Sequence, residues 1–216
     1  MPPGSRLNLP NIITLARIAV CPVLFFLAKS EDNDARYAAF VLFVVAALSD
    51  IWDGYLARKH GLITDMGKLL DPLADKLLLV ATFWAFYIVS HRPGELNLVP
   101  YLGALPLWIL VVIFGREALI TVFRQWAQRR GVVIAAGKSG KVKTLAQNLF
   151  MGALLFWYPL VITANERGWV EGAVWGRVAL SLGVFIAGTL LIALVLTVYS
   201  MIDYLWSYRS VVGVRD

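Results

Sequence analysis

Four aspartates are the residues of this chain best placed to do chemistry. Asp50, Asp53, Asp71 and Asp75 lie on or beside very apolar runs. At about 100° per residue, Asp50 and Asp53 fall on one side of a helix, and Asp71 and Asp75, four residues apart, share one face of another. Two helices joined by the short polar segment 59–68 would therefore bring all four carboxylates together.

Such a cluster needs a positive partner. One acid at the centre of a bilayer costs roughly 2.5–3.5 kcal/mol on insertion scales, so four unpaired acids would cost on the order of 10 kcal/mol. Arg58 and Lys76 are the nearby cations, and they leave the four acids under-compensated. Oxygen ligands without His or Cys suit hard cations, so the sequence predicts a site for two divalent ions, Mg²⁺ or Mn²⁺.

The acids also belong to a longer pattern, D-x2-D-G-x2-A-R-x8-G-x3-D-x3-D. Its fixed positions are Asp50, Asp53, Gly54, Ala57, Arg58, Gly67, Asp71 and Asp75. This pattern resembles the signature of the CDP-alcohol phosphotransferases, which are integral membrane enzymes of phospholipid synthesis. In the alternative without a function, Asp71 caps a helix before Pro72 and the other acids are solvated helix ends. That alternative does not explain the remaining seven positions.

The resemblance implies transfer of a phosphatidyl group from CDP-diacylglycerol to an alcohol, with CMP as the product. It implies that Asp50, Asp53, Asp71 and Asp75 are metal ligands and that Asp75 is also the catalytic base. The residues implied to bind CDP-diacylglycerol are Asp53, Gly54, Ala57, Arg58 and Gly67. Members of the family are commonly homodimers, and a bacterial member belongs in the cytoplasmic (inner) membrane.

The composition agrees with a membrane protein. The 216 residues are 59% hydrophobic and 16% charged, whereas soluble domains are nearer half apolar and a quarter charged. The net charge of +6 is spread between apolar segments, which favours anionic lipid over nucleic acid as the partner. We expect one all-α domain over residues 1–216, with six transmembrane helices around a polar cavity open to the cytoplasm. The expected spans, each roughly 20 residues or longer, are 10–28, 38–57, 69–89, 98–123, 145–163 and 174–204.

Loop charges predict the orientation of the chain in the membrane. Twelve basic residues fall on the side of both termini and the acidic motif, and five fall on the other side. By the positive-inside rule, both termini and the motif face the cytoplasm.

A second set of basic residues bears on the acceptor alcohol. Arg116 and Arg124 are close to one helical face, and Lys138, Lys141 and Lys143 follow in a segment expected to be a cytoplasmic loop. Glu117 is adjacent to Arg116, so the two should point to different faces. The cations suit an acceptor that carries a phosphate, and the region is similar to that of family members that use glycerol 3-phosphate. Inositol phosphate, inositol and serine are alternative acceptors, and the lysines alone could be a loop that contacts anionic lipid.

A polar stripe leads into the first span. Asn11, Thr14 and Arg17 recur three residues apart. A capped helix explains Asn11 and Thr14, but Arg17 lies deeper and needs an anionic partner, either a motif carboxylate or a substrate phosphate.

Two other classes of protein could carry an acidic transmembrane cluster. One is a cation transporter, whose repeated halves and broken helices are not evident here. The other is an aspartate-rich prenyltransferase, which lacks the D-G-x2-A-R connection.

Overall fold

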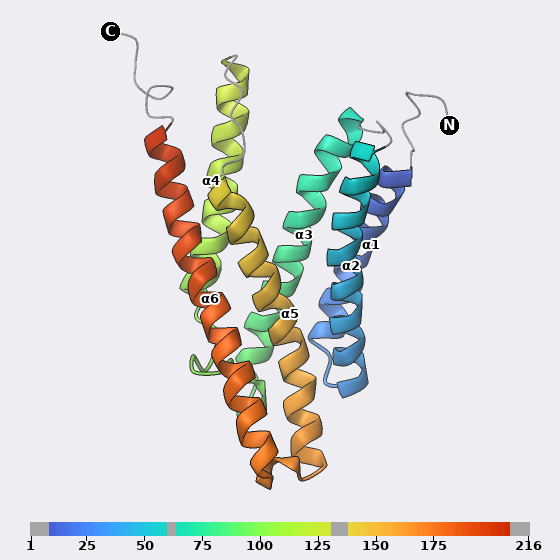
Figure 1. Cartoon of the computed structure of the whole chain (residues 1–216), viewed down its shortest axis with the longest axis vertical. Helices are drawn as coiled ribbons and strands as arrows, with labels where there is room; N and C mark the ends of the chain where they lie inside the picture. The colour runs from blue at the N-terminus through green and yellow to red at the C-terminus, as the bar shows by residue number, and fades with distance from the viewer. Residues whose placement is uncertain (1–8, 60–63, 131–137, 208–216) are drawn as a thin grey trace.

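The protein is a bundle of long helices (Figure 1). The computed structural model describes residues 9–59, 64–130 and 138–207. The helices are α1 (Leu9–Ala28), α2 (Asn33–Lys59), α3 (Asp65–Ser90), α4 (Leu107–Arg129), α5 (Lys138–Glu166) and α6 (Ala173–Ser207), with short 3-10 helices η1 (Glu95–Asn97) and η2 (Trp169–Glu171). Within these ranges the only strand-like feature is an isolated bridge between Val99 and Gly103. The predicted all-α fold is confirmed.

Membrane-spanning length and apolar character are found in five of the described helices. These are α1, α2, α3, α5 and α6, and the chain is therefore a multi-pass membrane protein. The fourth predicted span is not among the five, so the count of six spans stays a prediction. Figure 1 shows that α1 begins and α6 ends at the same end of the bundle.

The fourth apolar segment becomes helical later than predicted. Residues 98–106 form a loop in which Tyr101 and Gly103 have positive φ angles of 62° and 77°, and α4 begins only after Pro106, its N-cap. Proline restricts the residue before it to extended conformations. The prolines at positions 100 and 106 therefore oppose a continuous helix through this run, although it is apolar.

The lysine-rich segment also differs from the prediction. Lys138, Lys141 and Lys143 lie in the first turns of α5 and not in a loop. Glycine inside a helix costs about 1 kcal/mol relative to alanine, and Gly140 favoured the loop prediction. In the structure its carbonyl accepts a hydrogen bond from Thr144 Oγ1 at 3.0 Å, and the helix continues through it.

Aromatic side chains pack α3 against α5 in the core of the bundle. α1 packs against α2 and α3, and α5 packs against α2 and α6. Phe83 and Phe86 of α3 and Phe150 of α5 are fully buried. The Phe150 ring centroid lies 5.5 Å from that of Phe83 and 6.0 Å from that of Phe86, within the range of favourable aromatic pairs.

Hydrogen bonds connect the N-terminal part of α2 to neighbouring segments. The buried Arg36 donates to Ser30 O at 2.7 Å and to Asn97 Oδ1 of η1 at 3.2 Å. Asn33 Nδ2 donates to Thr163 Oγ1 of α5 at 2.9 Å. This end is therefore held together by hydrogen bonds, while the motif acids lie toward the opposite end of α2.

Candidate active site

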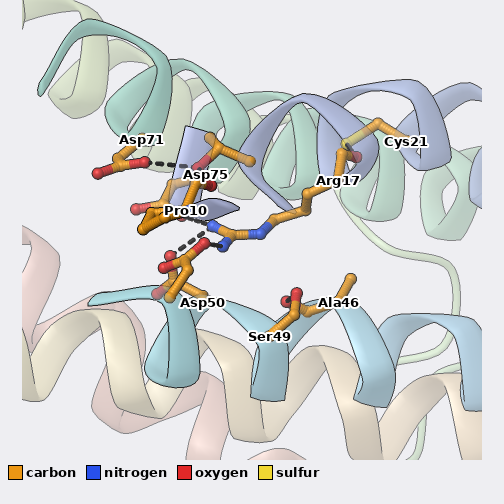
Figure 2. A network of polar contacts seen from close by, with 10 residues as sticks. Pro10, Arg17, Cys21, Ala46, Ser49, Asp50, Asp71 and Asp75 are labelled. Atoms are coloured by element: carbon orange, nitrogen blue, oxygen red, sulfur yellow. Dashed lines mark hydrogen bonds and ion pairs between the residues drawn. The ribbon is translucent and has the colours of Figure 1, made fainter. Parts of the chain in front are cut away.

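Arg17 of α1 is the centre of the acidic cluster. Figure 2 shows its guanidinium pointing between Asp50 of α2 and Asp75 of α3. Its Nη1 contacts Asp50 Oδ1 and lies 3.4 Å from Asp75 Oδ1, and its Nη2 contacts Asp53 Oδ2. The Arg17 side chain is only 1% exposed. Of the two partners that the sequence left open for Arg17, the structure shows the motif carboxylates.

The fourth acid is held by a different residue of α1. Thr14 Oγ1 donates to Asp71 Oδ1 at 2.9 Å. Asp71 lies inside α3, whose N-cap is Thr64, and the Thr64 hydroxyl accepts from Gly67 N at 3.1 Å. The alternative in which Asp71 is a helix cap is therefore wrong. The polar stripe of α1 faces the signature helices along its length, because Asn11 Nδ2 also donates to Thr64 Oγ1 at 2.9 Å.

Gly67 allows α1 and α3 to approach closely. A Cβ atom at this position would lie 2.9 Å from Asn11 Oδ1, a distance that requires the Asn11 side chain or the helix that carries it to shift. Close packing of α1 against α3 therefore explains the glycine at this position. Its predicted contact with CDP-diacylglycerol stays a prediction. Gly54 lies in α2, as do Ala57 and Arg58, whose side chains are outside the described part of the structure.

A cavity of about 580 Å³ lies beside the acids. Asp50 and Asp75 line it, and their side chains are 44% and 52% exposed. Asp53 is 5% exposed and packs against Arg17. The volume of the cavity is within the range of small-molecule sites, and Asp50 and Asp75 are the acids of the cluster that line it.

Most of the predicted acceptor residues line the same cavity from α4 and α5, and these residues form its basic wall. Arg116 and Arg124 of α4 and Lys143 of α5 line it together with Glu117. Arg116 Nη1 lies 3.1 Å from Glu117 Oε1, and Lys143 Nζ contacts the same oxygen. The expectation that Arg116 and Glu117 point apart is wrong, because their long side chains bend toward each other from adjacent positions. The side chains of Lys138 and Lys141 are outside the described part of the structure.

Two further features of the cavity were missed in the sequence. Lys76 Nζ of α3 donates to Thr121 Oγ1 of α4 at 2.6 Å, which links the acidic wall to the basic wall. Gln147 lines the cavity and is 2% exposed. It follows Lys143 by four residues and therefore shares its helical face, a spacing that could have indicated it.

The acids already bind a cation in this structure, namely the Arg17 guanidinium. Among the described residues, no three acid, His or Cys side chains are gathered as a metal-ligand set. Three carboxylates from two helices nevertheless converge on one positive group. Their oxygens are the donor type that Mg²⁺ and Mn²⁺ prefer, so the donor set fits a divalent cation in its chemistry.

Comparisons with known proteins agree with the acidic signature. A CDP-diacylglycerol–glycerol-3-phosphate 3-phosphatidyltransferase of Bacillus subtilis is 39% identical over 160 residues, which is 68% of this chain and 76% of the relative. A probable phosphatidylglycerophosphate synthase of Mycobacterium tuberculosis is 37% identical over 71% of this chain and 67% of its own. A CMP-forming cardiolipin synthase of rice is 35% identical over 71% of this chain and 47% of its own. Residues 7–212 match the CDP-alcohol phosphatidyltransferase family, and the chain belongs to that family.

Proposed function

We propose that this protein transfers the phosphatidyl group of CDP-diacylglycerol to a hydroxyl of sn-glycerol 3-phosphate, giving phosphatidylglycerophosphate and CMP. One observation carries the proposal: a single cavity has carboxylates of α2 and α3 on one wall and cations of α4 and α5 on the other. The names of the Bacillus and Mycobacterium relatives support the same reaction.

Asp75 is the residue best placed to accept the acceptor's proton. Its carboxylate lines the cavity and is half exposed, so an alcohol can reach it. As the hydroxyl oxygen bonds to the lipid-side phosphorus, its proton passes to Asp75, and the bond from that phosphorus to the CMP oxygen breaks. A positioned general base typically contributes about 10²–10⁴-fold.

The same carboxylates would hold the divalent ions. Asp50, Asp53, Asp71 and Asp75 are the proposed ligands of two Mg²⁺ or Mn²⁺ ions, which supply neutralising charge for the pyrophosphate when bound. In this arrangement Arg17 keeps the carboxylates of α2 and α3 close together, because it contacts both helices.

The basic wall favours an acceptor that carries a phosphate. Such an acceptor adds about two negative charges next to a pyrophosphate, so its pocket needs cations of its own. Arg116, Arg124 and Lys143 line the cavity, and Lys141 and Lys138 lie two and five residues closer to the start of α5. An arginine can bind phosphate through two parallel hydrogen bonds, which also fixes the orientation of the acceptor.

The rice relative leaves room for a second candidate within the same reaction class. Its name is that of a CMP-forming cardiolipin synthase, so a different acceptor on the same fold is the main alternative, together with inositol phosphate, inositol and serine. We propose further that the cavity opens to the cytoplasm in a bacterial inner membrane and that the protein is a homodimer.

CMP release from CDP-diacylglycerol by the purified protein, measured with a panel of acceptors, tests the proposal. Glycerol 3-phosphate should be preferred, and Arg116→Gln should raise its KM far more than that of CDP-diacylglycerol. Arg129→Gln is the matched control, because it removes the same charge from the last turn of α4 at an exposed position. A preference for serine, choline or free inositol would show that the acceptor assignment is wrong.

A further inference from the structure

Two buried N–H groups on the basic wall have no hydrogen-bond partner among the described residues. They are Nε of Arg116 and Nε2 of Gln147, and both residues line the cavity. Leaving a buried donor without an acceptor is costly, and such groups are uncommon in native proteins. The two donors are therefore candidate contacts for a ligand that brings oxygen atoms into this part of the cavity.

The neighbouring polar groups are already engaged by the protein. Arg116 uses Nη1 for Glu117 and donates from Nη2 to Ser200 Oγ of α6 at 3.1 Å. Lys143 contacts the same Glu117 carboxylate from α5. Glu117 thus offsets one of the two positive charges and holds both side chains in place, while Arg116 Nε and Gln147 Nε2 are buried and have no acceptor among the described residues.

We propose that Gln147 is a specificity-determining residue, whose Nε2 amide donates a hydrogen bond to a phosphate oxygen of the acceptor, next to Arg116 Nε. A phosphate is favoured over a neutral hydroxyl because Arg116 and Lys143 together carry one more positive charge than Glu117 removes. The inference rests on the proposed function for the identity of the acceptor, but binding of phosphate at Gln147 can be measured without turnover.

The experiment uses the full-length protein in lipid nanodiscs. Gln147→Met removes the donor while keeping an unbranched side chain of similar length, and Gln147→Glu replaces the donor with a negative charge. Met151→Leu is the control, because Met151 is also buried on α5, one turn further along, and volume-conserving apolar changes are well tolerated.

A hydrogen bond to a charged group corresponds to about a 10- to 150-fold change in affinity. We expect Gln147→Met to raise the KM for glycerol 3-phosphate by roughly that factor, with kcat and the KM for CDP-diacylglycerol changed about twofold or less. Gln147→Glu should weaken binding of the acceptor further, because the carboxylate of the new side chain repels phosphate. If Gln147 only supported the fold, both substitutions would lower kcat and thermal stability, and the acceptor KM would not rise from wild type to Gln147→Met to Gln147→Glu.

Calorimetric titration of inorganic phosphate, in the absence of CDP-diacylglycerol, separates the two proposals. If the wild-type protein makes no product from glycerol 3-phosphate, the proposed function fails, and the titration still decides the role of Gln147. Phosphate binding that Gln147→Met weakens while Met151→Leu preserves it supports the inference. Equal phosphate affinity in the wild type and Gln147→Met, or an unchanged acceptor KM, would overturn it.

Discussion

Replacing Arg17 with glutamine should make the stability of the protein depend on divalent cations. The guanidinium is almost fully buried and contacts three carboxylates, of which Asp53 is buried with it. Removing one partner of a buried ion pair typically costs about 3–5 kcal/mol. Asp50 and Asp75 are about half exposed, so water weakens their ion pairs with Arg17. We therefore expect the loss of stability to be at the lower value, about 3 kcal/mol.

In a protein of this size, each kcal/mol shifts the unfolding midpoint by about 2–4 °C. Arg17→Gln should therefore unfold roughly 6–12 °C below the wild type in chelator. Added Mg²⁺ should restore most of this loss, because a ligand at 100 times its Kd contributes about 2.7 kcal/mol. The variant should also bind Mn²⁺ more tightly than the wild type, since no guanidinium competes for the same oxygens.

Arg36→Gln is the control for this experiment. Arg36 is also a buried arginine, but it donates to neutral oxygens of Ser30 and Asn97 near the start of α2. Its loss should lower the midpoint equally in chelator and in Mg²⁺. If Arg17→Gln behaves in the same way, or unfolds with the wild type in chelator, the acids do not need a cation and the reasoning fails.

Three further predictions follow from the walls of the cavity and the loop charges. Asp75→Asn should lower turnover by about 10²–10⁴-fold while CDP-diacylglycerol still binds; near-normal turnover would remove Asp75 from the mechanism. Glu117→Gln leaves Lys143, whose side chain is 4% exposed, without its carboxylate, so thermal unfolding should occur earlier and inorganic phosphate should stabilise the variant more than the wild type. Equal stabilisation of both proteins would contradict this. Cysteines introduced at Lys59 and Glu95 should react with impermeant reagents from opposite sides of the membrane, and labelling of position 59 from outside intact cells would refute the proposed orientation.

The helices and the acidic face could be predicted because both depend on local periodicity. Asp71 and Asp75 lie on one face of α3 as their spacing indicates, and Asp50 and Asp53 share Arg17 as partner. That Arg17 would bind them, and not a substrate phosphate, could not be read from the chain. The choice depends on how α1 packs against α2 and α3, which is a tertiary property.

The basic wall was predicted less well for three physical reasons. Lysines next to Gly140 resembled a loop, yet this segment is helical, and Lys143 and Thr144 of α5 line the cavity. Arg116 and Glu117 are adjacent, but flexible side chains can meet where backbone directions diverge. Gln147 carries no charge and belongs to no motif, so its spacing from Lys143 was the one sequence signal, and its buried Nε2 atom, unpaired among the described residues, becomes apparent only in the folded structure.

The contact between Arg17 and the acids also bears on how the chain enters the membrane. Chains are synthesised from the N-terminus, so α1 is made before α2 and α3. A helix that carried these aspartates into the membrane alone would meet part of the penalty of placing a carboxylate in hydrocarbon. Here the countercharge is already present when Asp50, Asp53 and Asp75 arrive. Arg17 thus makes the order of biosynthesis part of the way this cavity is assembled.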